Sequence, residues 1–312
     1  MIMTVKGPIE ETSLGKALVH EHIICDFSGA DTTIQGGYDR EDVIRVILPF
    51  LKSIKDYSFS SFFDCTPKYI GRDVKVLYKL SEESGINIIT NTGYYGAAND
   101  KFVPRFVHDL REEEIARLWI DEWKNGIDGT TIKPGFIKTG VDPSRLSEID
   151  KKLIVASAIT HLETGLTIAC HTGEEVCALE VFETVKELGV SPTALIIVHA
   201  DSIEDKNVIF RLAEEGCWIE YDSIGSKSIE FHVRLIVDTI ERGFLSQLLL
   251  SHDAGWYTVG EPRGGESKIR PYTYIVEYLI PRLIKEGLEE ETITNILVDN
   301  PASAFSITVR KS

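Results

Sequence analysis

Histidines and a carboxylate end several short apolar runs of this sequence, and their side chains are of types that bind metal ions. They are His20 and His22 in the run 17–22, His171 in 166–172, His199 in 194–200 and Asp253 in 248–253. Side chains alternate between the two faces of a strand, so His20 and His22 share one face and Glu21 points to the other. An HxH motif alone is weak evidence. Four histidines and a carboxylate at equivalent strand ends together predict a site for Zn, Mn, Co or Fe.

A lysine ends one further run and points to different chemistry. Lys138 lies in GFIKTG at 135–140. Taken alone it would be an ordinary ion-pair partner, but an ammonium group facing bound metal ions would be repelled by them. Burial and nearby positive charge favour the neutral amine, which can react with carbon dioxide to form a carbamate. Because a carbamate is a bidentate anion, Lys138 is a candidate ligand that bridges two metals.

The elements that must position these residues follow a repeated pattern. Short apolar runs rich in β-branched residues alternate with stretches of helical period. The runs are 17–22, 60–66, 86–93, 135–140, 166–172, 194–200, 217–222 and 248–253, and the helical stretches include 40–57, 72–85, 112–126, 148–165, 178–189 and 205–216. Several helices end at a Gly in the C-cap region.

Eight β-then-α units with nearly continuous apolar strands predict an α/β fold, a (β/α)8 TIM barrel with its active site at the C-terminal ends of the strands. A doubly wound open sheet is the alternative. It usually has a Gly-rich phosphate-binding turn after the first strand, where this chain has His-Glu-His. No Pro, Gly or Ser-rich linker divides the chain, so we expect residues 1–312 to form a single domain.

Composition excludes several classes of partner. The chain has 33 basic and 49 acidic residues and a net charge of −16, which disfavours nucleic acid and anionic membranes. No stretch approaches 18 apolar residues and no signal peptide is evident, so we expect a cytoplasmic protein with no membrane partner. The five cysteines form no CxxC pair, which argues against a disulfide framework or a thiolate zinc site.

The sequence resembles the phosphotriesterase and phosphotriesterase-like lactonase family of the amidohydrolase superfamily. The resemblance covers nearly the whole chain, through VHEHI, GFIKTGVD, IACHTG, IVHAD and LLLSHDAG in that order. It implies two divalent metal ions, with zinc as the first choice. The implied ligands are His20, His22 and Asp253 for the more buried ion, His171 and His199 for the more exposed one, and Lys138 as N6-carboxylysine bridging both.

The same resemblance implies a mechanism. A hydroxide that bridges the two metals attacks the substrate, and the exposed metal polarises the carbonyl or phosphoryl oxygen. Asp253 then accepts the proton of the nucleophile and returns it to the leaving alkoxide.

Loops after the strands supply the candidate substrate contacts. In lactonases of this family a tyrosine in the loop after strand 3 lies over the metals, and Tyr94 or Tyr95 resembles that tyrosine. An equal alternative is that these tyrosines pack on the rim of the barrel. The Gly and Pro content of 254–274 predicts an irregular lid that carries Trp256. Lys227, Arg263 and Arg270 lie in loops 7 and 8, the usual phosphate corner of such barrels, and are candidates for binding an anionic substituent.

The remaining polar residues near the motifs have structural interpretations. His108, His161, His232 and His252 are expected to be structural or exposed, with His252 facing the surrounding helices. Glu21 and Asp26 have two possible roles, support of the metal ligands or simple hydrogen bonding. Asp64 is expected to be structural.

Three functions remain open. The first is a dinuclear metal-dependent lactonase that opens a small lactone, a phosphorylated sugar lactone among the candidates, with promiscuous phosphotriesterase activity. The second is a phosphotriester or other ester hydrolase, a cyclic amidase or a mononuclear deaminase of the superfamily; Lys138 argues against the deaminase. The third, a non-catalytic binding protein, is disfavoured by the complete ligand set. The expected substrate is then a small ester or lactone. The family resemblance also implies that the protein forms a homodimer.

Overall fold

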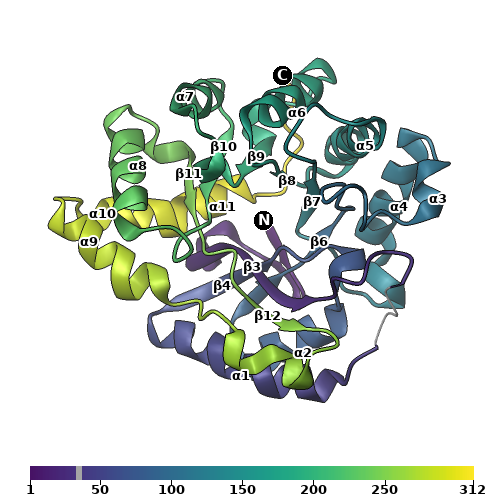
Figure 1. Ribbon diagram of the computed structural model, residues 1–312, viewed down its shortest axis with the longest axis horizontal. Helices are drawn as coiled ribbons and strands as arrows, with labels where there is room; N and C mark the ends of the chain where they lie inside the picture. Colours follow the sequence, from purple (N-terminus) through teal and green to yellow (C-terminus); the bar gives the residue numbers. More distant parts are fainter. Residues whose placement is uncertain (33–36) are drawn as a thin grey trace.

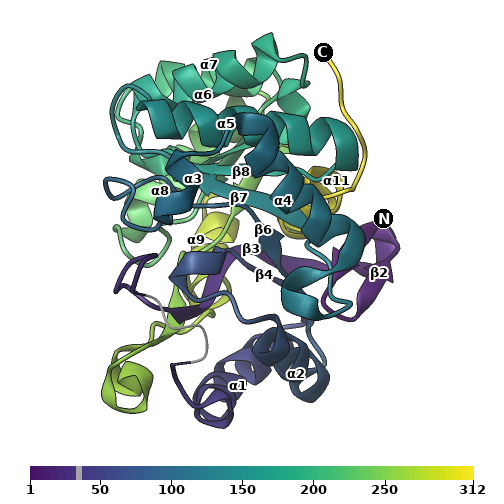
Figure 2. The same cartoon turned by 90° about the vertical axis from the view of Figure 1, so that its right-hand side faces the viewer.

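The computed structural model describes residues 1–32 and 37–312, and its helices form an outer layer around short strands (Figure 1). The strands are β1 (Ile2–Thr4), β2 (Gly7–Ile9), β3 (Lys16–Cys25), β4 (Phe59–Asp64), β5 (Asn87–Ile89), β6 (Asn91–Thr92), β7 (Phe136–Gly140), β8 (Ile168–His171), β9 (Leu195–Val198), β10 (Trp218–Tyr221), β11 (Leu248–Leu250) and β12 (Gly255–Thr258). β1 and β2 form an antiparallel hairpin near the N-terminus, at the right of Figure 2.

The helices confirm the six that the sequence predicted. They are α1 (Arg40–Asp56), α2 (Val74–Ser84), α3 (Arg105–His108), α4 (Glu112–Asn125), α5 (Glu148–Thr164), α6 (Glu175–Glu187), α7 (Lys206–Glu214), α8 (Ile229–Glu241), α9 (Ile280–Lys285), α10 (Glu290–Thr294) and α11 (Asn300–Ala304). Side-chain caps begin α2 at Asp73 and α5 at Ser147, and left-handed glycines end these helices at Gly85 and Gly165. None of the described helices is long and apolar enough to cross a bilayer.

All pairs among β3–β12 are parallel and form two arcs, in the orders β11-β10-β9-β8-β7-β6 and β12-β3-β4-β5. The predicted strand 86–93 is divided between the arcs into β5 and β6. The predicted strand 248–253 is shorter in the structure, as β11, and the chain joins the other arc only beyond it, as β12. Backbone bonds bridge the second gap, from Ser251 N to Tyr221 O at 3.0 Å and from Asp253 N to His20 O at 3.1 Å. The α/β fold with parallel pairing is confirmed, and its strand order is that of a (β/α)8 barrel.

A β-bulge in β3 directs the first two histidines inward. The pairing of β3 with β4 changes register between Leu18 and Glu21. As a result Val19, which packs in the apolar cluster inside the sheets, and the next residue, His20, both face inward. Glu21 then faces outward and His22 inward again. Bulges commonly redirect side chains in this way beside active sites.

The loop 254–274 is partly regular, which differs from the predicted irregular lid. Gly255–Thr258 form β12, whose Gly255 pairs with His22 of β3. The following segment Pro262–Lys268 is a 3-10 helix interrupted by left-handed residues at Arg263, Gly264 and Gly265. The Gly and Pro content of this segment predicts irregular structure, but backbone pairing with β3 makes part of it a regular strand.

A buried ion pair holds the end of β6 against α4. The guanidinium of Arg72 donates to Glu122 at 2.6 and 2.8 Å and to the carbonyl of Asn91 at 2.7 Å. The hydroxyl of Thr92 donates to the same Glu122 carboxylate at 2.7 Å. Burial alone would raise the pKa of Glu122, but the charge of Arg72 outweighs it and holds that pKa below its usual value.

We expect Glu122→Gln to lower the free energy of unfolding at neutral pH by roughly 3 kcal/mol, because it leaves the buried Arg72 charge with only the more distant carboxylate of Asp128, at 3.8 Å. The folded-state pKa is lowered, so this stabilisation is full above the ordinary carboxyl pKa and is lost as the pH falls below it. Urea unfolding at pH 7 and pH 4 measures both effects. Glu163→Gln is the control, since its ion pair with Lys124 is exposed and should change stability far less. Equal effects of the two substitutions would contradict the prediction.

Candidate metal centre

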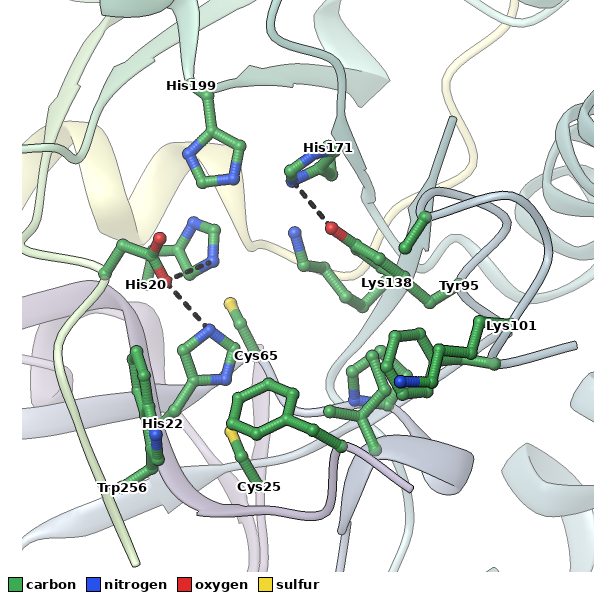
Figure 3. Close-up of a pocket in the computed structure, with 16 residues that line it drawn as sticks. His20, His22, Cys25, Cys65, Tyr95, Lys101, Lys138, His171, His199 and Trp256 are labelled. Carbon is green, nitrogen blue, oxygen red and sulfur yellow. Dashed lines mark hydrogen bonds and ion pairs between the residues drawn. The ribbon is translucent and has the colours of Figure 1, made fainter. Parts of the chain in front are cut away.

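The predicted ligands converge at the C-terminal ends of the strands. Figure 3 shows the side chains of the four histidines and Lys138 turned toward one another, and Asp253 lines the same pocket. The carboxylate of Asp253 lies 3.0 Å from Nε2 of His22 and 3.8 Å from Nε2 of His20. The backbone of Asp253 is in the left-handed region, with φ of 48°, in the gap between β11 and β12. This conformation is costly for a residue with a side chain, and such outliers commonly mark functional sites.

His171 and His199 complete the group from the neighbouring strands. His171 ends β8 and His199 follows β9 with φ of 61°. Their ring centres are 4.3 Å apart, and the ring centre of His199 is 5.2 Å from that of His20. Four imidazoles and a carboxylate therefore line one pocket, a donor set that suits divalent transition metals.

Lys138 of β7 lies between these imidazoles, with its amine pointing into the space that they enclose (Figure 3). Its side chain is buried at 2% exposure, and its Nζ atom has no hydrogen-bond partner among residues 1–32 and 37–312. An unpaired ammonium in such a place would be strongly unfavourable. A carboxylated amine that binds cations removes this conflict, so the residues present fit the implied metal centre.

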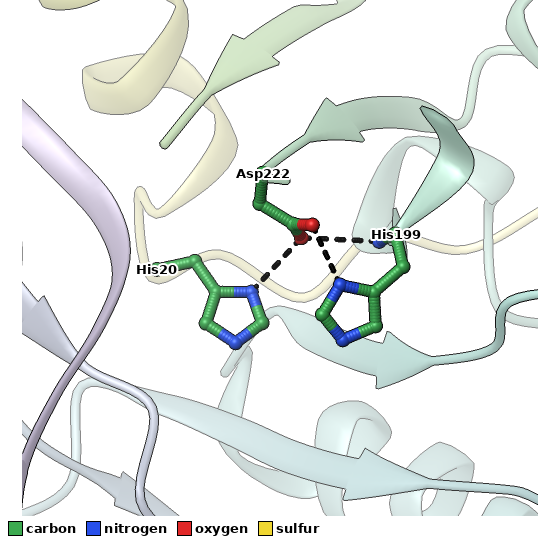
Figure 4. Close-up of side chains that lie close together, drawn as sticks. All are labelled: His20, His199 and Asp222. Atoms are coloured by element: carbon green, nitrogen blue, oxygen red, sulfur yellow. Dashed lines mark hydrogen bonds and ion pairs between the residues drawn. The ribbon is translucent and has the colours of Figure 1, made fainter. Parts of the chain in front are cut away.

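Asp222, which follows β10, orients two of the histidines (Figure 4). Its carboxylate accepts from Nδ1 of His199 at 2.6 Å, lies 3.1 Å from Nδ1 of His20 and accepts from the backbone N–H of His199 at 3.1 Å. Burial would raise the pKa of Asp222, but its contacts with His199 and His20 outweigh this and hold the pKa well below its usual range. Nδ1 of His199 faces Asp222, and Nδ1 of His20 faces both Asp222 and, at 2.6 Å, Glu220, so each Nε2 is left free to bind a metal.

The hydrogen bonds around His22 point to a cation beside Asp253. Thr66 donates its hydroxyl proton to Asp64 at 3.0 Å, so it accepts from Nδ1 of His22 at 2.9 Å. Nε2 of His22 then carries a lone pair that faces the carboxylate of Asp253 at 3.0 Å. A positive charge must therefore lie between these two atoms: a proton in the metal-free site, which makes His22 the donor to Asp253, or a metal ion that replaces that proton.

Burial sets the protonation of the ligands in favour of metal binding. It lowers the pKa of His20 to about 3 and that of His171 well below its usual value; the charge of Lys138 adds to the effect in both, and the charge of Asp253 opposes it. Burial also lowers the pKa of His199, but the charge of Asp222 outweighs it and the net shift is upward. For Asp253 burial raises the pKa, yet the hydrogen bond from His22 and the nearby imidazoles hold it well below its usual range.

Only two of the predicted substrate contacts lie in the pocket. The hydroxyl of Tyr95 is 3.1 Å from Nδ1 of His171. The ring of Trp256 is 5.8 Å from that of His22. Both line a cavity of about 410 Å³ that contains the metal ligands. The tyrosine nearest the predicted metals is therefore Tyr95.

The structure places the other four away from this cavity. Tyr94 is buried between the rings of Tyr69 and Trp119, because the turn after β6 directs it outward to the core. Lys227 donates to the carbonyl of Asp201 at 2.6 Å, and Arg263 pairs with Glu266 at the surface. Arg270 donates to the carbonyls of His252 at 3.0 Å and Asp253 at 3.3 Å, so it braces the backbone of a ligand. These cations are occupied by contacts within the protein.

The other four histidines are buried outside the pocket or exposed, as the sequence predicted. His252 is buried and faces Glu21, with Nδ1 2.6 Å from its carboxylate. His161 and His232 are buried with hydrogen-bond partners, and His108 is exposed. Glu21 also accepts from the backbone N–H of Ala254 at 3.0 Å, so it holds the segment that carries Asp253.

Sequence reasoning missed Asp222, Glu220, Thr66 and Lys101. Glu220 lies 2.6 Å from Nδ1 of His20, and Lys101 lines the pocket from the loop after β6. A signal for the first two was present in CWIEYD, where two carboxylates at i and i+2 end an apolar strand on one face. Thr66 and Lys101 belong to loops, and no periodicity predicts where such side chains point.

We expect Asp222→Asn to weaken metal binding by about 10- to 100-fold, because an amide cannot hold both imidazoles with Nε2 free. Competition with a chelator measures the affinity. Asp238→Asn is the control, since Asp238 pairs with Arg242 and Lys206 near the surface and should leave the affinity unchanged. Unchanged metal affinity in Asp222→Asn would show that this carboxylate does not orient the ligands.

Comparisons with known proteins agree with this geometry. A model of the phosphotriesterase family matches residues 1–305. The chain is 27% identical to the phosphotriesterase homology protein of Escherichia coli, over 93% of this chain and 98% of the relative. It is 29% identical to the aryldialkylphosphatase of Saccharolobus solfataricus, over 96% and 98%. It is 28% identical to the N-acetyltaurine hydrolase of Dictyostelium discoideum, over 98% of each.

Proposed function

The chain belongs to the phosphotriesterase family of dinuclear metal-dependent hydrolases, and we propose that this ester-acting enzyme is a lactonase. The observation that carries the proposal is Tyr95. Its hydroxyl lies 3.1 Å from His171, beside the ligand cluster and inside the cavity. A hydroxyl in this place can donate to the ring oxygen or carbonyl of a lactone held at the metals.

The proposed metal centre contains two ions and uses the six side chains that converge on the pocket. His20, His22 and Asp253 would hold one ion, His171 and His199 would hold the other, and Lys138 would contribute to both as N6-carboxylysine. Zinc is the first choice, with manganese, cobalt or iron as alternatives that the same ligands accept. We further propose that residues 1–312 act as one cytoplasmic hydrolase domain and that the enzyme is a homodimer, as the family resemblance implies.

The residues of this chain then have distinct tasks. When bound, two divalent ions lower the pKa of a shared water and polarise the oxygen of the bond under attack. Asp253 is ionised at neutral pH and lies among the ligands, so it accepts the proton of the nucleophile and returns it to the leaving alkoxide. Tyr95 positions the substrate, and the ring of Trp256 covers the side of the cavity next to His22.

Amide hydrolysis is the second candidate. It is supported by the match to the N-acetyltaurine hydrolase of Dictyostelium discoideum over nearly the whole of both chains. The same centre could act on a phosphotriester, since one relative is an aryldialkylphosphatase. Ester, amide and phosphotriester each offer an electrophile to the same nucleophile, so the fold alone does not rank them.

Metal analysis combined with a substrate panel tests the proposal. We expect about two metal ions per chain. The panel contains lactones with and without a phosphate, N-acyl amino sulfonates and phosphotriesters, and we expect the highest kcat/KM for a lactone. One ion per chain would contradict the dinuclear centre. A higher kcat/KM for the amides would replace the lactonase with the second candidate, and no turnover in a metal-loaded sample would leave a binding protein.

A further inference from the structure

We propose that Lys101, at the wall of the metal pocket, binds an anionic group on the substrate, so that the enzyme acts on substrates with an apolar body and a negatively charged end. This inference rests on the proposed function for the bond that is cleaved. It concerns the opposite end of the same substrate. The chemistry that Lys101 would recognise is a carboxylate, sulfonate or phosphate.

Lys101 is the exposed cation of this pocket. Of the residues that line the cavity, the other basic side chains are the buried Lys138 and the four histidines of the proposed metal centre. Figure 3 shows Lys101 at the wall of the pocket. Its ammonium lies 5.6 Å from the ring centre of Phe102, which also lines the cavity. Among residues 1–32 and 37–312, no carboxylate forms an ion pair with it. Its charge is therefore available to a ligand.

The backbone that carries Lys101 is held in a costly conformation. Ala98, Asn99 and Asp100 all have positive φ, of 65°, 55° and 57°. The left-handed region is unfavourable for each of these residues, and three in succession need external support. The carboxylate of Asp142 supplies it by accepting from the backbone N–H groups of Ala98 at 2.8 Å and Asn99 at 3.1 Å. Strain of this kind persists where surrounding structure enforces it, often beside a binding site.

This turn is tied directly to the metal centre. Asp142 follows β7, the strand that carries Lys138, and Gly96 N–H donates to Gly140 O of the same strand at 2.9 Å. On its other side, the carbonyl of Lys101 accepts from Ala30 N–H at 2.9 Å in the loop after β3. The position of Lys101 relative to the ligands is thus set by contacts with β7 and with the loop that follows β3.

The rest of the cavity wall selects an apolar body. Phe27, Ile70, Phe102 and Trp256 line it outside the ligands, and the rings of Phe27 and Trp256 are 6.1 Å apart. Apolar groups gain free energy by contact with such walls, whereas a sugar would leave its hydroxyls without partners there. The cations of loops 7 and 8, which the sequence suggested for anion binding, have contacts elsewhere. Lys101 takes that role instead.

A binding experiment tests the anion site without relying on turnover. Hexanesulfonate and the neutral hexan-1-ol are titrated by calorimetry into the metal-loaded enzyme, into Lys101→Met and into the control Lys52→Met, an exposed lysine of α1. Methionine keeps the methylene stem and removes the charge. We expect Lys101→Met to weaken hexanesulfonate roughly tenfold and to leave hexanol unchanged, with no effect of Lys52→Met. Equal sulfonate affinity in the wild-type and Lys101→Met proteins would overturn the inference.

Hydrolysis of three γ-lactones, with side chains that end in a methyl, a carboxylate or a phosphate, separates the two proposals. We expect Lys101→Met to lower kcat/KM for the charged lactones about tenfold, mainly through KM, and to spare the methyl lactone. The better of the two charged lactones identifies the anion. Turnover that is independent of Lys101 would overturn the anion site and leave the lactonase. Sulfonate binding that depends on Lys101, without turnover of any lactone, would overturn the lactonase and leave the anion site.

Discussion

Lys138→Ala is expected to lower kcat/KM by at least about 10³-fold and to reduce the metal content below two ions per chain. The amine of Lys138 points into the space between the imidazoles, and it has no hydrogen-bond partner among the described residues. In the proposed centre it is the one protein side chain that would bridge both ions. Its loss would remove a negative charge from between two cations and so strengthen their mutual repulsion.

Small carboxylic acids provide the decisive control for this variant. Alanine leaves a space that acetate or propionate can fill, and a carboxylate has the bidentate shape of a carbamate. We therefore expect either acid to restore part of the activity and the second equivalent of metal. Lys151→Ala, at an exposed position of α5, should change neither quantity. Full activity in Lys138→Ala without added acid would defeat the carbamate model.

Asp253→Asn is expected to lower kcat by about 10³-fold. An amide cannot accept the proton of the nucleophile, and it is a weaker metal ligand than a carboxylate. Steady-state kinetics at saturating metal separate the two losses, because added metal can restore the ligand role but not the proton transfer. We expect kcat to remain low after the metal content has returned to that of the wild type.

Asp26→Asn is a matched control for Asp253→Asn. Asp26 is a buried carboxylate just beyond β3 that accepts from Ser28 N–H at 2.9 Å and does not line the cavity. Its replacement should change kcat less than tenfold. If saturating metal restores the kcat of Asp253→Asn, then Asp253 is a ligand alone and another group accepts the proton.

The architecture and the ligand cluster could be predicted because both depend on local periodicity. Apolar runs that alternate with helical stretches predict parallel strands, and the last residues of parallel strands meet at one end of the fold. Residues such as His171 and Asp253 therefore had to come close together. The prediction that His252 faces away from them follows from the same alternation, and its contact with Glu21 agrees with it.

Loop side chains could not be predicted in the same way. Tyr94 and Tyr95 are adjacent and chemically identical, yet one is buried against Trp119 and the other lies beside His171. The cations of loops 7 and 8 bind protein carbonyls and carboxylates, while Lys101 from loop 3 lines the cavity. Such choices depend on turn geometry and on partners distant in the chain, and neither is encoded in a repeating pattern.

The sequence by itself determined the strand order and which histidines and carboxylates meet at the strand ends, because these follow from residue type and period. Only the tertiary structure decided how the ligands face the cavity. The bulge before His20 turns two successive residues of β3 inward, and left-handed backbone at His199 and Asp253 aims the other side chains. Each departure from a regular strand costs free energy locally, and contacts from neighbouring strands and from Asp222 and Arg270 maintain it.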